Sequence, residues 1–183
     1  MADAASRTDL WVNFLNTADV RVMAELGVWK GEFSASILSA CHQIERYYMV
    51  DPWAHLPDWN KPFNVSPEDF ADIEAEALHK TDFARDKRHV LKGRTQEVLH
   101  EIEDGSLDFV YIDGDHTLRG ITLDLMLSYA KAREGGYIGG DDFVSTPWQH
   151  STDYEPTLVC PFAIYFAEAM NVPIRALPHG QFI

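Results

Sequence analysis

Short apolar runs alternate with longer amphipathic stretches along most of the chain. The runs have the length of buried strands, whereas the stretches between them repeat their apolar residues at helical spacing. We therefore predict strands over residues 20–26, 46–51, 88–92, 107–112, 137–139, 173–177 and, in part, 181–183. Helices are predicted over residues 7–16, 33–42, 95–101, 118–133 and 161–170, with a further helix that starts after a cap at Ser66.

This alternation is typical of parallel sheets whose strands are connected through helices. The predicted fold class is α/β, a Rossmann-like three-layer sandwich around a mainly parallel, seven-stranded sheet. The first strand, the helix after it and the second strand have the size of one βαβ unit. A chain of 183 residues is long enough to bury one core, so we expect a single domain over residues 1–183.

Turn and cap residues indicate where several of these elements begin and end. Ser66-Pro67 is a typical helix cap followed by a first-turn proline. Gly135-Gly136 would stop the helix over residues 118–133, and Asp115 would cap its start. Residues 52–66 are rich in Pro, Trp and Asn, which predicts a long ordered loop that acts as a lid.

Charge and hydropathy narrow the classes of partner. The formal net charge of −14 argues against nucleic acids, which are bound through clustered Lys and Arg, and favours a small neutral or cationic substrate. No apolar run approaches the roughly 18 residues that a membrane span needs. The first residues lack the basic and apolar regions of a secretory signal, so we expect a cytoplasmic protein. Cys41 and Cys160 form no disulfide or metal-binding pattern.

Acidic residues follow two of the predicted strands directly. Asp113 comes after the strand over residues 107–112, and Asp141 and Asp142 come after the next strand. Because parallel strands end at the same edge of a sheet, these carboxylates are expected to lie close together. Three carboxylates suit a hard, all-oxygen cation site, with His116 beside it. A histidine that hydrogen-bonds a loop carbonyl is the alternative for His116.

The turn after the first predicted strand carries a second group of candidate residues. Gly27 and Gly31 would allow a ligand to approach the backbone, and Asp51 is placed to accept the hydroxyls of a ribose. Glu25 would repel a pyrophosphate but suits the cationic groups of a cofactor without phosphates. The full Gly-x-Gly-x-x-Gly pattern is absent, which counts against NAD. A plain turn is the alternative for the two glycines.

Four segments together carry a resemblance. They are Ala-Glu-Leu-Gly-Val-Trp-Lys-Gly at 24–31, Val-Asp-Pro-Trp at 50–53, Phe-Val-Tyr-Ile-Asp-Gly-Asp-His at 109–116 and Gly-Gly-Tyr-Ile-Gly-Gly-Asp-Asp at 135–142. In their order and spacing they resemble the class I S-adenosylmethionine-dependent methyltransferases. Within that superfamily the chain looks most like the small metal-dependent O-methyltransferases, which include the catechol and macrolide-sugar enzymes.

The resemblance implies a role for each matching residue. Contacts to S-adenosylmethionine would come from Glu25, Gly27 and Gly31 at the methionine moiety, Asp51 at the ribose, Trp53, Thr95 and Gln96 at the adenine, and Asp113. Asp113, Asp141 and Asp142 fall where the family binds Mg²⁺, and His116 falls where it places a general base. A divalent cation on the acceptor hydroxyl would lower its pKa and hold it beside the methyl group.

The predicted function is therefore methyl transfer from S-adenosylmethionine to a hydroxyl of a small molecule, such as a sugar, a polyketide or a catechol. Mg²⁺ would activate the hydroxyl, and His116 would take its proton. The alternatives are an NAD-linked oxidoreductase of the same fold and a catalytically silent module that only binds the cofactor. The sequence leaves open the acceptor, the position methylated and whether the chain forms a homo-oligomer.

Overall fold

The computed structural model describes residues 4–183, and within them seven strands form one sheet in the order β3-β2-β1-β4-β5-β7-β6. The strands are β1 (Val22–Leu26), β2 (Arg46–Asp51), β3 (Arg88–Lys92), β4 (Leu107–Ile112), β5 (Ala132–Gly140), β6 (Ala176–Leu177) and β7 (Gln181–Phe182). The helices are α1 (Arg7–Thr17), α2 (Glu32–Ala40), α3 (Pro67–Lys80), α4 (Thr95–Val98), α5 (Leu118–Lys131) and α6 (Val159–Met170). Three short 3-10 turns are η1 (Asp82–Ala84), η2 (Leu99–Glu101) and η3 (Pro178–Gly180).

The sheet is mainly parallel. β1 pairs in parallel with β2 and with β4, β2 with β3, and β4 with β5, whereas the short strands β6 and β7 add an antiparallel edge. The strand order reverses at β1, because the chain moves outward from β1 to β3 and then returns to the other side of β1 as β4. The carboxyl ends of β1 and β4 therefore border a crevice, which is the usual ligand position in such sheets.

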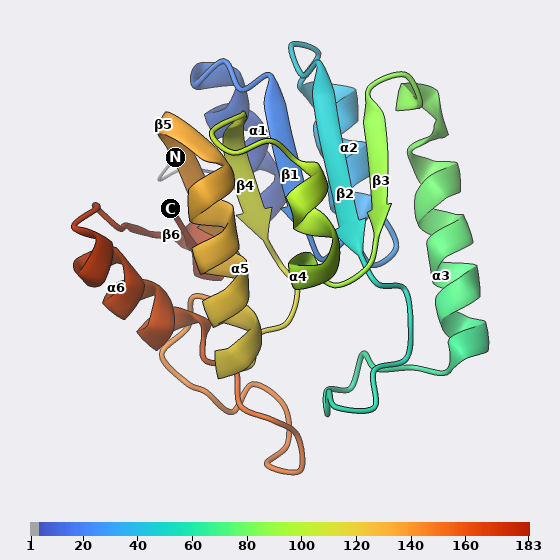
Figure 1. The fold of residues 1–183 in the computed structure, drawn as a ribbon, viewed down its shortest axis with the longest axis vertical. Coiled ribbons are helices and arrows are strands. Elements are labelled where there is room, and N and C mark those ends of the chain that lie inside the picture. Colours follow the sequence, from blue (N-terminus) through green and yellow to red (C-terminus); the bar gives the residue numbers. More distant parts are fainter. Residues whose placement is uncertain (1–3) are drawn as a thin grey trace.

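Helices cover both faces of this sheet, as the predicted three-layer sandwich requires (Figure 1). One core lies beneath α1, α2 and α3 and contains Met23, Tyr47 and Phe109. The other lies beneath α5 and α6 and contains Ala24 and Val110. Successive strand residues point to opposite faces, so the central strands are mostly apolar on both sides and appear in the sequence as apolar runs, broken in β1 by Glu25 and in β4 by Asp108. The predicted fold class is confirmed.

Two boundary predictions around α5 are wrong. The helix ends at Lys131 because Ala132 already pairs with Leu107 in β4, so Gly135-Gly136 lies inside β5 and does not stop the helix. Thr117, not Asp115, caps α5 by accepting a hydrogen bond from the backbone N–H of Gly120 at 3.2 Å.

The lid prediction over residues 52–66 falls on a segment without a helix or strand, between β2 and α3. Ser66 caps α3 as predicted, with its hydroxyl accepting the N–H of Asp69 at 3.1 Å. Every helix in the described part of the chain is too short or too polar to cross a membrane.

Candidate active site

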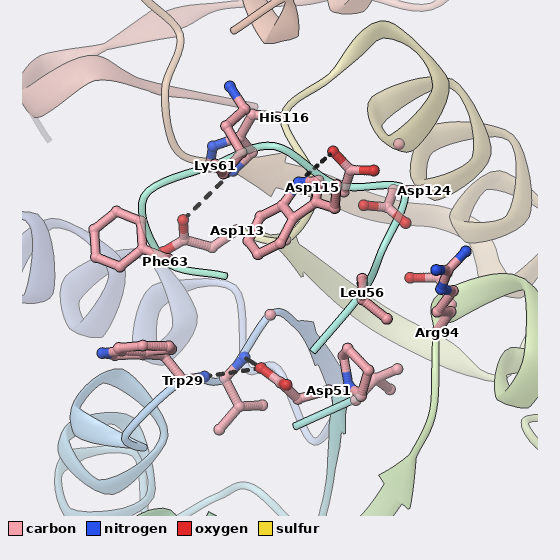
Figure 2. Close-up of a pocket in the computed structure, with 18 of the residues that line it drawn as sticks. Trp29, Asp51, Leu56, Lys61, Phe63, Arg94, Asp113, Asp115, His116 and Asp124 are labelled. Atoms are coloured by element: carbon pink, nitrogen blue, oxygen red, sulfur yellow. Dashed lines mark hydrogen bonds and ion pairs between the residues drawn. The ribbon is translucent and has the colours of Figure 1, made fainter. Parts of the chain in front are cut away.

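A cavity of about 550 Å³ lies at the carboxyl ends of the central strands, a size typical of small-molecule sites. Segments far apart in the sequence line it: the end of β1, the lid, the start of α4 and the residues after β4 and β5. Most of the predicted site residues reach it: Glu25, Gly27, Asp51, Thr95, Gln96, Asp113, His116, Asp141 and Asp142. Asp51 and His116 occupy separate ends of the cavity (Figure 2).

Glu25 lies at the end of β1 with its carboxyl group buried. One carboxyl oxygen accepts hydrogen bonds from the Tyr47 hydroxyl at 2.6 Å and from the Ser34 hydroxyl. Burial raises the pKa of Glu25 to about 8, although these two hydrogen bonds oppose the rise. A carboxyl group held in this state can ionise when a cationic ligand group arrives beside it.

Gly27 allows two strand ends to approach closely. Its φ is +90°, and a Cβ atom at this position would lie 2.2 Å from the carbonyl oxygen of Asp113. Its N–H also donates to the carbonyl of Val50 at 2.9 Å, which ties the end of β1 to β2. The residue lines the cavity as predicted, and the structure adds a packing reason for glycine here.

Asp51 holds the turn that follows β1. Its Oδ2 accepts the backbone N–H groups of Val28 and Trp29 at 2.8 and 2.9 Å, and its Oδ1 accepts that of Trp53 at 2.8 Å. Figure 2 shows this carboxylate directed at the turn beside Trp29. Burial raises the pKa of Asp51, and the three backbone hydrogen bonds oppose that rise. Asp51 therefore orders the turn at this end of the cavity, which it also lines.

Gly31 and Trp53 do not line the cavity, so the cofactor contacts predicted for them are not supported. Gly31 begins α2 with φ +74°, and a Cβ atom there would lie 2.9 Å from the Cα of Ala77 in α3. Trp53 is 3% exposed within the core. Its indole N–H donates to the carbonyl of Trp29 at 2.8 Å. Both residues pack against neighbouring elements.

The opposite wall is formed by the start of α4 and by α5. Thr95 and Gln96 line this wall, as the adenine contacts predicted for them require. Sequence reasoning missed Asp124, which also lines the cavity and is 4% exposed. Burial raises the pKa of Asp124 to about 7, with Thr95 opposing the rise. The signal was present, because Asp124 lies beside Leu125 on the apolar face of α5.

The acidic strand ends meet as predicted, but their partners were not foreseen. Asp113 Oδ2 lies 3.0 Å from Nη1 of Arg7, and the same Nη1 donates to Asp141 Oδ2. Asp142 instead faces His116, with its Oδ2 at 2.5 Å from Nδ1 of the imidazole. Burial raises the pKa of Asp113 to about 7, against the lowering effect of His116 and Arg7.

These contacts bear on the predicted Mg²⁺ site. Within residues 4–183, no group of three or more His, Cys, Asp or Glu side chains is arranged to hold a metal ion. The physical reason is that a guanidinium lies between Asp113 and Asp141, while Asp142 is directed at His116. The predicted ligand triad thus does not fit a divalent cation in this arrangement. Arg7 carried no sequence signal beyond its place in the first helix.

His116 lies beside the acidic ends of β4 and β5, and one of its ring nitrogens contacts Asp142. The Nδ1 contact to Asp142 assigns the ring proton to Nδ1 and leaves the lone pair on Nε2. Nε2 is buried, makes no hydrogen bond to any described residue and lies 3.6 Å from Asp113 Oδ1, a pair marked in Figure 2. Burial lowers the pKa of His116, but Asp142, Asp113 and Asp141 reverse this and raise it above its ordinary value.

The segment predicted to be a lid contacts the loop after β5 beside the cavity. Lys61 is buried, and its ammonium donates to the carbonyl of Glu155 at 2.8 Å and to the Thr157 hydroxyl at 3.2 Å. Burial lowers the pKa of Lys61. The indole N–H of Trp59 donates to Asp115 at 3.1 Å, which anchors the lid to the segment after β4. This segment is thus held to the residues that follow β4 and to those that follow β5.

Comparison with known proteins agrees with this geometry. Residues 24–143, well over half of the chain, match a family described as a methyltransferase domain. The chain therefore belongs to this methyltransferase family. Together with the seven-stranded sheet, this confirms the predicted class I S-adenosylmethionine-dependent methyltransferase fold. No curated protein sequence matches the chain.

Several solved structures share the fold. A Staphylococcus aureus protein proposed to be a caffeoyl-CoA O-methyltransferase is 12% identical, with 96% of this chain and 79% of that chain covered and a TM-score of 0.71. The O-methyltransferase TomG from Streptomyces achromogenes, solved with S-adenosylmethionine, is 14% identical, with 100% and 81% covered and a TM-score of 0.66. A Bacillus cereus O-methyltransferase, solved with S-adenosylhomocysteine, is 17% identical, with 100% and 81% covered and a TM-score of 0.65.

Proposed function

We propose that this protein transfers the methyl group of S-adenosylmethionine to a hydroxyl of a small molecule. The observation that carries the proposal is the position of His116: a buried imidazole in the cavity wall, oriented by Asp142, whose Nε2 has no hydrogen-bond partner among the described residues. Membership in a methyltransferase family favours S-adenosylmethionine over NAD as the cofactor. The chain acts as a single methyltransferase domain, with residues 52–66 as its lid.

The cofactor lies across the ends of β1 and β2. Its amino acid portion faces Glu25, whose carboxylate is stabilised by the cationic amine. Its ribose lies over Asp51, and its adenine extends toward Thr95 and Gln96, with Asp124 as a further polar contact. This placement is supported by the cavity, which runs continuously from Glu25 to the start of α4. The donor methyl group then points toward Asp113 and His116.

The acceptor hydroxyl lies between that methyl group and Nε2 of His116. The hydroxyl proton passes to Nε2, and an oxygen lone pair forms the new bond to the methyl carbon. The bond from carbon to sulfur breaks, and its electron pair returns to sulfur, which leaves a methyl ether and S-adenosylhomocysteine. In-line attack needs the oxygen within about 3 to 3.5 Å of the methyl carbon, so positioning is the main task of the site. Asp142 stabilises the imidazolium that forms.

The acceptor is a compact hydroxylated molecule of the sugar, polyketide or catechol type. It enters beneath the lid, where Trp59 and His150 line the cavity beside the acidic strand ends. Aromatic side chains stack on planar rings or on the apolar faces of sugars, and they exclude water from the reacting oxygen. The divalent cation of the resembled enzymes has no step in this proposal, because Arg7 engages two of its three candidate ligands.

The test combines binding with turnover. Calorimetric titration should show that the protein binds S-adenosylmethionine and S-adenosylhomocysteine but not NAD. Turnover is followed with methyl-labelled cofactor and a panel of catechols, sugars and hydroxylated polyketides. His116→Ala should lower kcat by about 100-fold or more while cofactor affinity stays unchanged, as expected for loss of a general base.

The control is His100→Ala, which removes an exposed histidine outside the cavity and should leave turnover unchanged. Binding of NAD in place of S-adenosylmethionine would overturn the proposal. A wild-type kcat in the His116→Ala protein would remove the general-base role. Cofactor binding without methylation of any acceptor would favour the silent-module alternative.

A further inference from the structure

Arg7 lies between the two carboxylates that end β4 and β5. Its Nη1 is 3.0 Å from Asp113 Oδ2 and donates to Asp141 Oδ2 as well. These are two of the three residues that the sequence assigns to a divalent cation. One positive group therefore already contacts both carboxylates, and a guanidinium keeps its charge around neutral pH.

The helix α1 places the backbone of Arg7, so the position of the guanidinium is set by more than the side-chain conformation. Ser6 caps α1 by accepting the N–H of Asp9 at 3.1 Å, which makes Arg7 the first residue of the helix. Trp11, one helical turn later, is fully buried. The guanidinium carbon lies 5.8 Å from the centre of the Phe33 ring. This cation–π contact helps to hold the guanidinium in place.

A hydrogen-bonded chain connects this helix to the acidic strand ends. The indole N–H of Trp11 donates to Oε1 of Gln181 at 2.7 Å, and the Gln181 side-chain amide donates to Asp141 Oδ1 at 2.5 Å. Asp141 Oδ1 also accepts the N–H of Asp142 at 2.7 Å, and its Oδ2 accepts from Arg7. Both carboxylate oxygens of Asp141 thus already accept hydrogen bonds from within the protein.

Arg7 has donors left over. Both of its carboxylate contacts use Nη1, and within residues 4–183 its Nε and Nη2 groups make no hydrogen bond. The side chain is 37% exposed and lines the cavity. Free N–H donors on a fixed cation, beside the imidazole of His116, can stabilise an oxygen that becomes negative as it loses its proton.

We propose that the guanidinium of Arg7 takes the place of the divalent cation: it neutralises Asp113 and Asp141, donates to the acceptor oxygen, and makes methyl transfer independent of metal. The contact between Arg7 and the acceptor oxygen rests on the proposed O-methyl transfer. The statement that Arg7 takes the place of the cation does not depend on that proposal. Asp113 and Asp141 then serve to position Arg7, while His116 receives the proton of the acceptor.

Metal binding tests the inference without any need for turnover. Calorimetric titration with Mn²⁺ should give no binding at this site in the wild-type protein, and one site in Arg7→Ala that is lost again in the double variant R7A/D141N. Arg21→Ala, which removes an exposed arginine outside the cavity, is the matched control and should behave as wild type. Equal Mn²⁺ binding by wild type and Arg7→Ala, or a wild-type site that Asp141→Asn removes, would overturn the inference.

Turnover provides the second readout. Wild-type kcat should be unchanged by a chelator, whereas Arg7→Ala should lose about 100-fold in kcat, the usual scale for a lost oxyanion donor. Arg7→Lys keeps the charge and should recover part of that loss, and Arg7→Met keeps the stem over Phe33 if Arg7→Ala does not fold. Loss of wild-type turnover in chelator, or full turnover in Arg7→Ala, would contradict the inference. If no acceptor is methylated at all, the proposed function fails while the Mn²⁺ titration still decides the role of Arg7.

Discussion

Nδ1 of His116 lies 2.5 Å from Oδ2 of Asp142, although the two residues follow different strands. Asp142 adopts a left-handed backbone conformation, with φ +59°, directly after β5, while Asp141 before it contacts Arg7. Adjacent carboxylates in the sequence thus have separate partners. The contact gives His116 a fixed ring orientation and one protonated nitrogen, both of which a general base requires.

Asp142→Asn should therefore impair catalysis more than binding. The amide cannot stabilise an imidazolium, and it favours the wrong ring tautomer, so we expect kcat to fall about 100-fold or more with little change in cofactor affinity. Initial rates and calorimetry measure the two quantities. Asp86→Asn, an exposed change outside the cavity, is the control. Equal losses in kcat and cofactor affinity would indicate a structural role for Asp142.

The raised pKa of Glu25 leads us to expect that the stability of the protein depends on pH. Burial raises its pKa from the ordinary 4.5 to about 8 in the folded protein. Between these values the folded state holds a proton that the unfolded chain has released, so this group makes the free energy of unfolding fall as pH rises from about 5 to about 8. The contribution is on the order of a few kcal/mol over that window.

Glu25→Gln should remove this component, because glutamine does not titrate. Urea unfolding at pH 5.5, 7 and 8.5 would compare the two proteins, and the variant should be less sensitive to pH across the window. Its stability relative to wild type should rise with increasing pH. The same slope in both proteins would show that Glu25 is ionised in the folded state throughout.

Gly27→Ala should destabilise the fold through a specific clash. A Cβ atom would lie 2.2 Å from the carbonyl oxygen of Asp113, and φ is +90°. We expect a loss of about 3 kcal/mol or more in the free energy of unfolding, the scale of combined strain and overpacking. Gly105→Ala is a matched control, because φ is also positive, at +66°, but no atom lies within 4 Å. That change should cost about 1 to 2 kcal/mol. Equal effects of the two changes would contradict the close approach of β1 and β4.

Lys61→Met should loosen the lid. The ammonium bonds to Glu155 and Thr157 are lost, while the aliphatic stem is kept. We expect amide hydrogen exchange over residues 56–64 to accelerate and KM for the acceptor to rise about 10-fold, since about 1 to 3 kcal/mol of charged hydrogen bonding is removed. Lys92→Met, which breaks an exposed ion pair with Glu74, is the control. Unchanged exchange in the lid would show that other contacts hold it closed.

The bounds of three parallel strands followed from the sequence, whereas β1 was predicted over residues 20–26 and spans Val22–Leu26. β2, β3 and β4 have the predicted bounds, and in the central strands β2 and β4 burial on both sides produces a mostly apolar run. β5 was predicted over residues 137–139 but spans Ala132–Gly140. Its first half is polar and glycine-containing, and its pairing with β4 is irregular, so it carries no apolar signal.

Some residues of the candidate site were predictable from the sequence, and others were not. Glu25, Asp113 and Asp141 follow strands or end them, so their place at the cavity follows from the order of strands and turns. Trp53 follows a strand as well, yet its ring is buried, because the fold around it and not the local pattern sets its direction. Asp124 was missed although it lines the cavity, because a charged residue in a helix is usually exposed, whereas this one lies on the buried face of α5.

The sequence by itself determined the class of fold, the methyltransferase motifs and the acidic character of two strand ends. Those properties depend on local patterns of a few residues. Only the tertiary structure decided what each carboxylate faces. Arg7 reaches Asp113 and Asp141 from 106 and 134 residues away in the chain, through a helix packed on the sheet. Contacts of this kind arise from how elements pack, which leaves no mark in local hydrophobic periodicity.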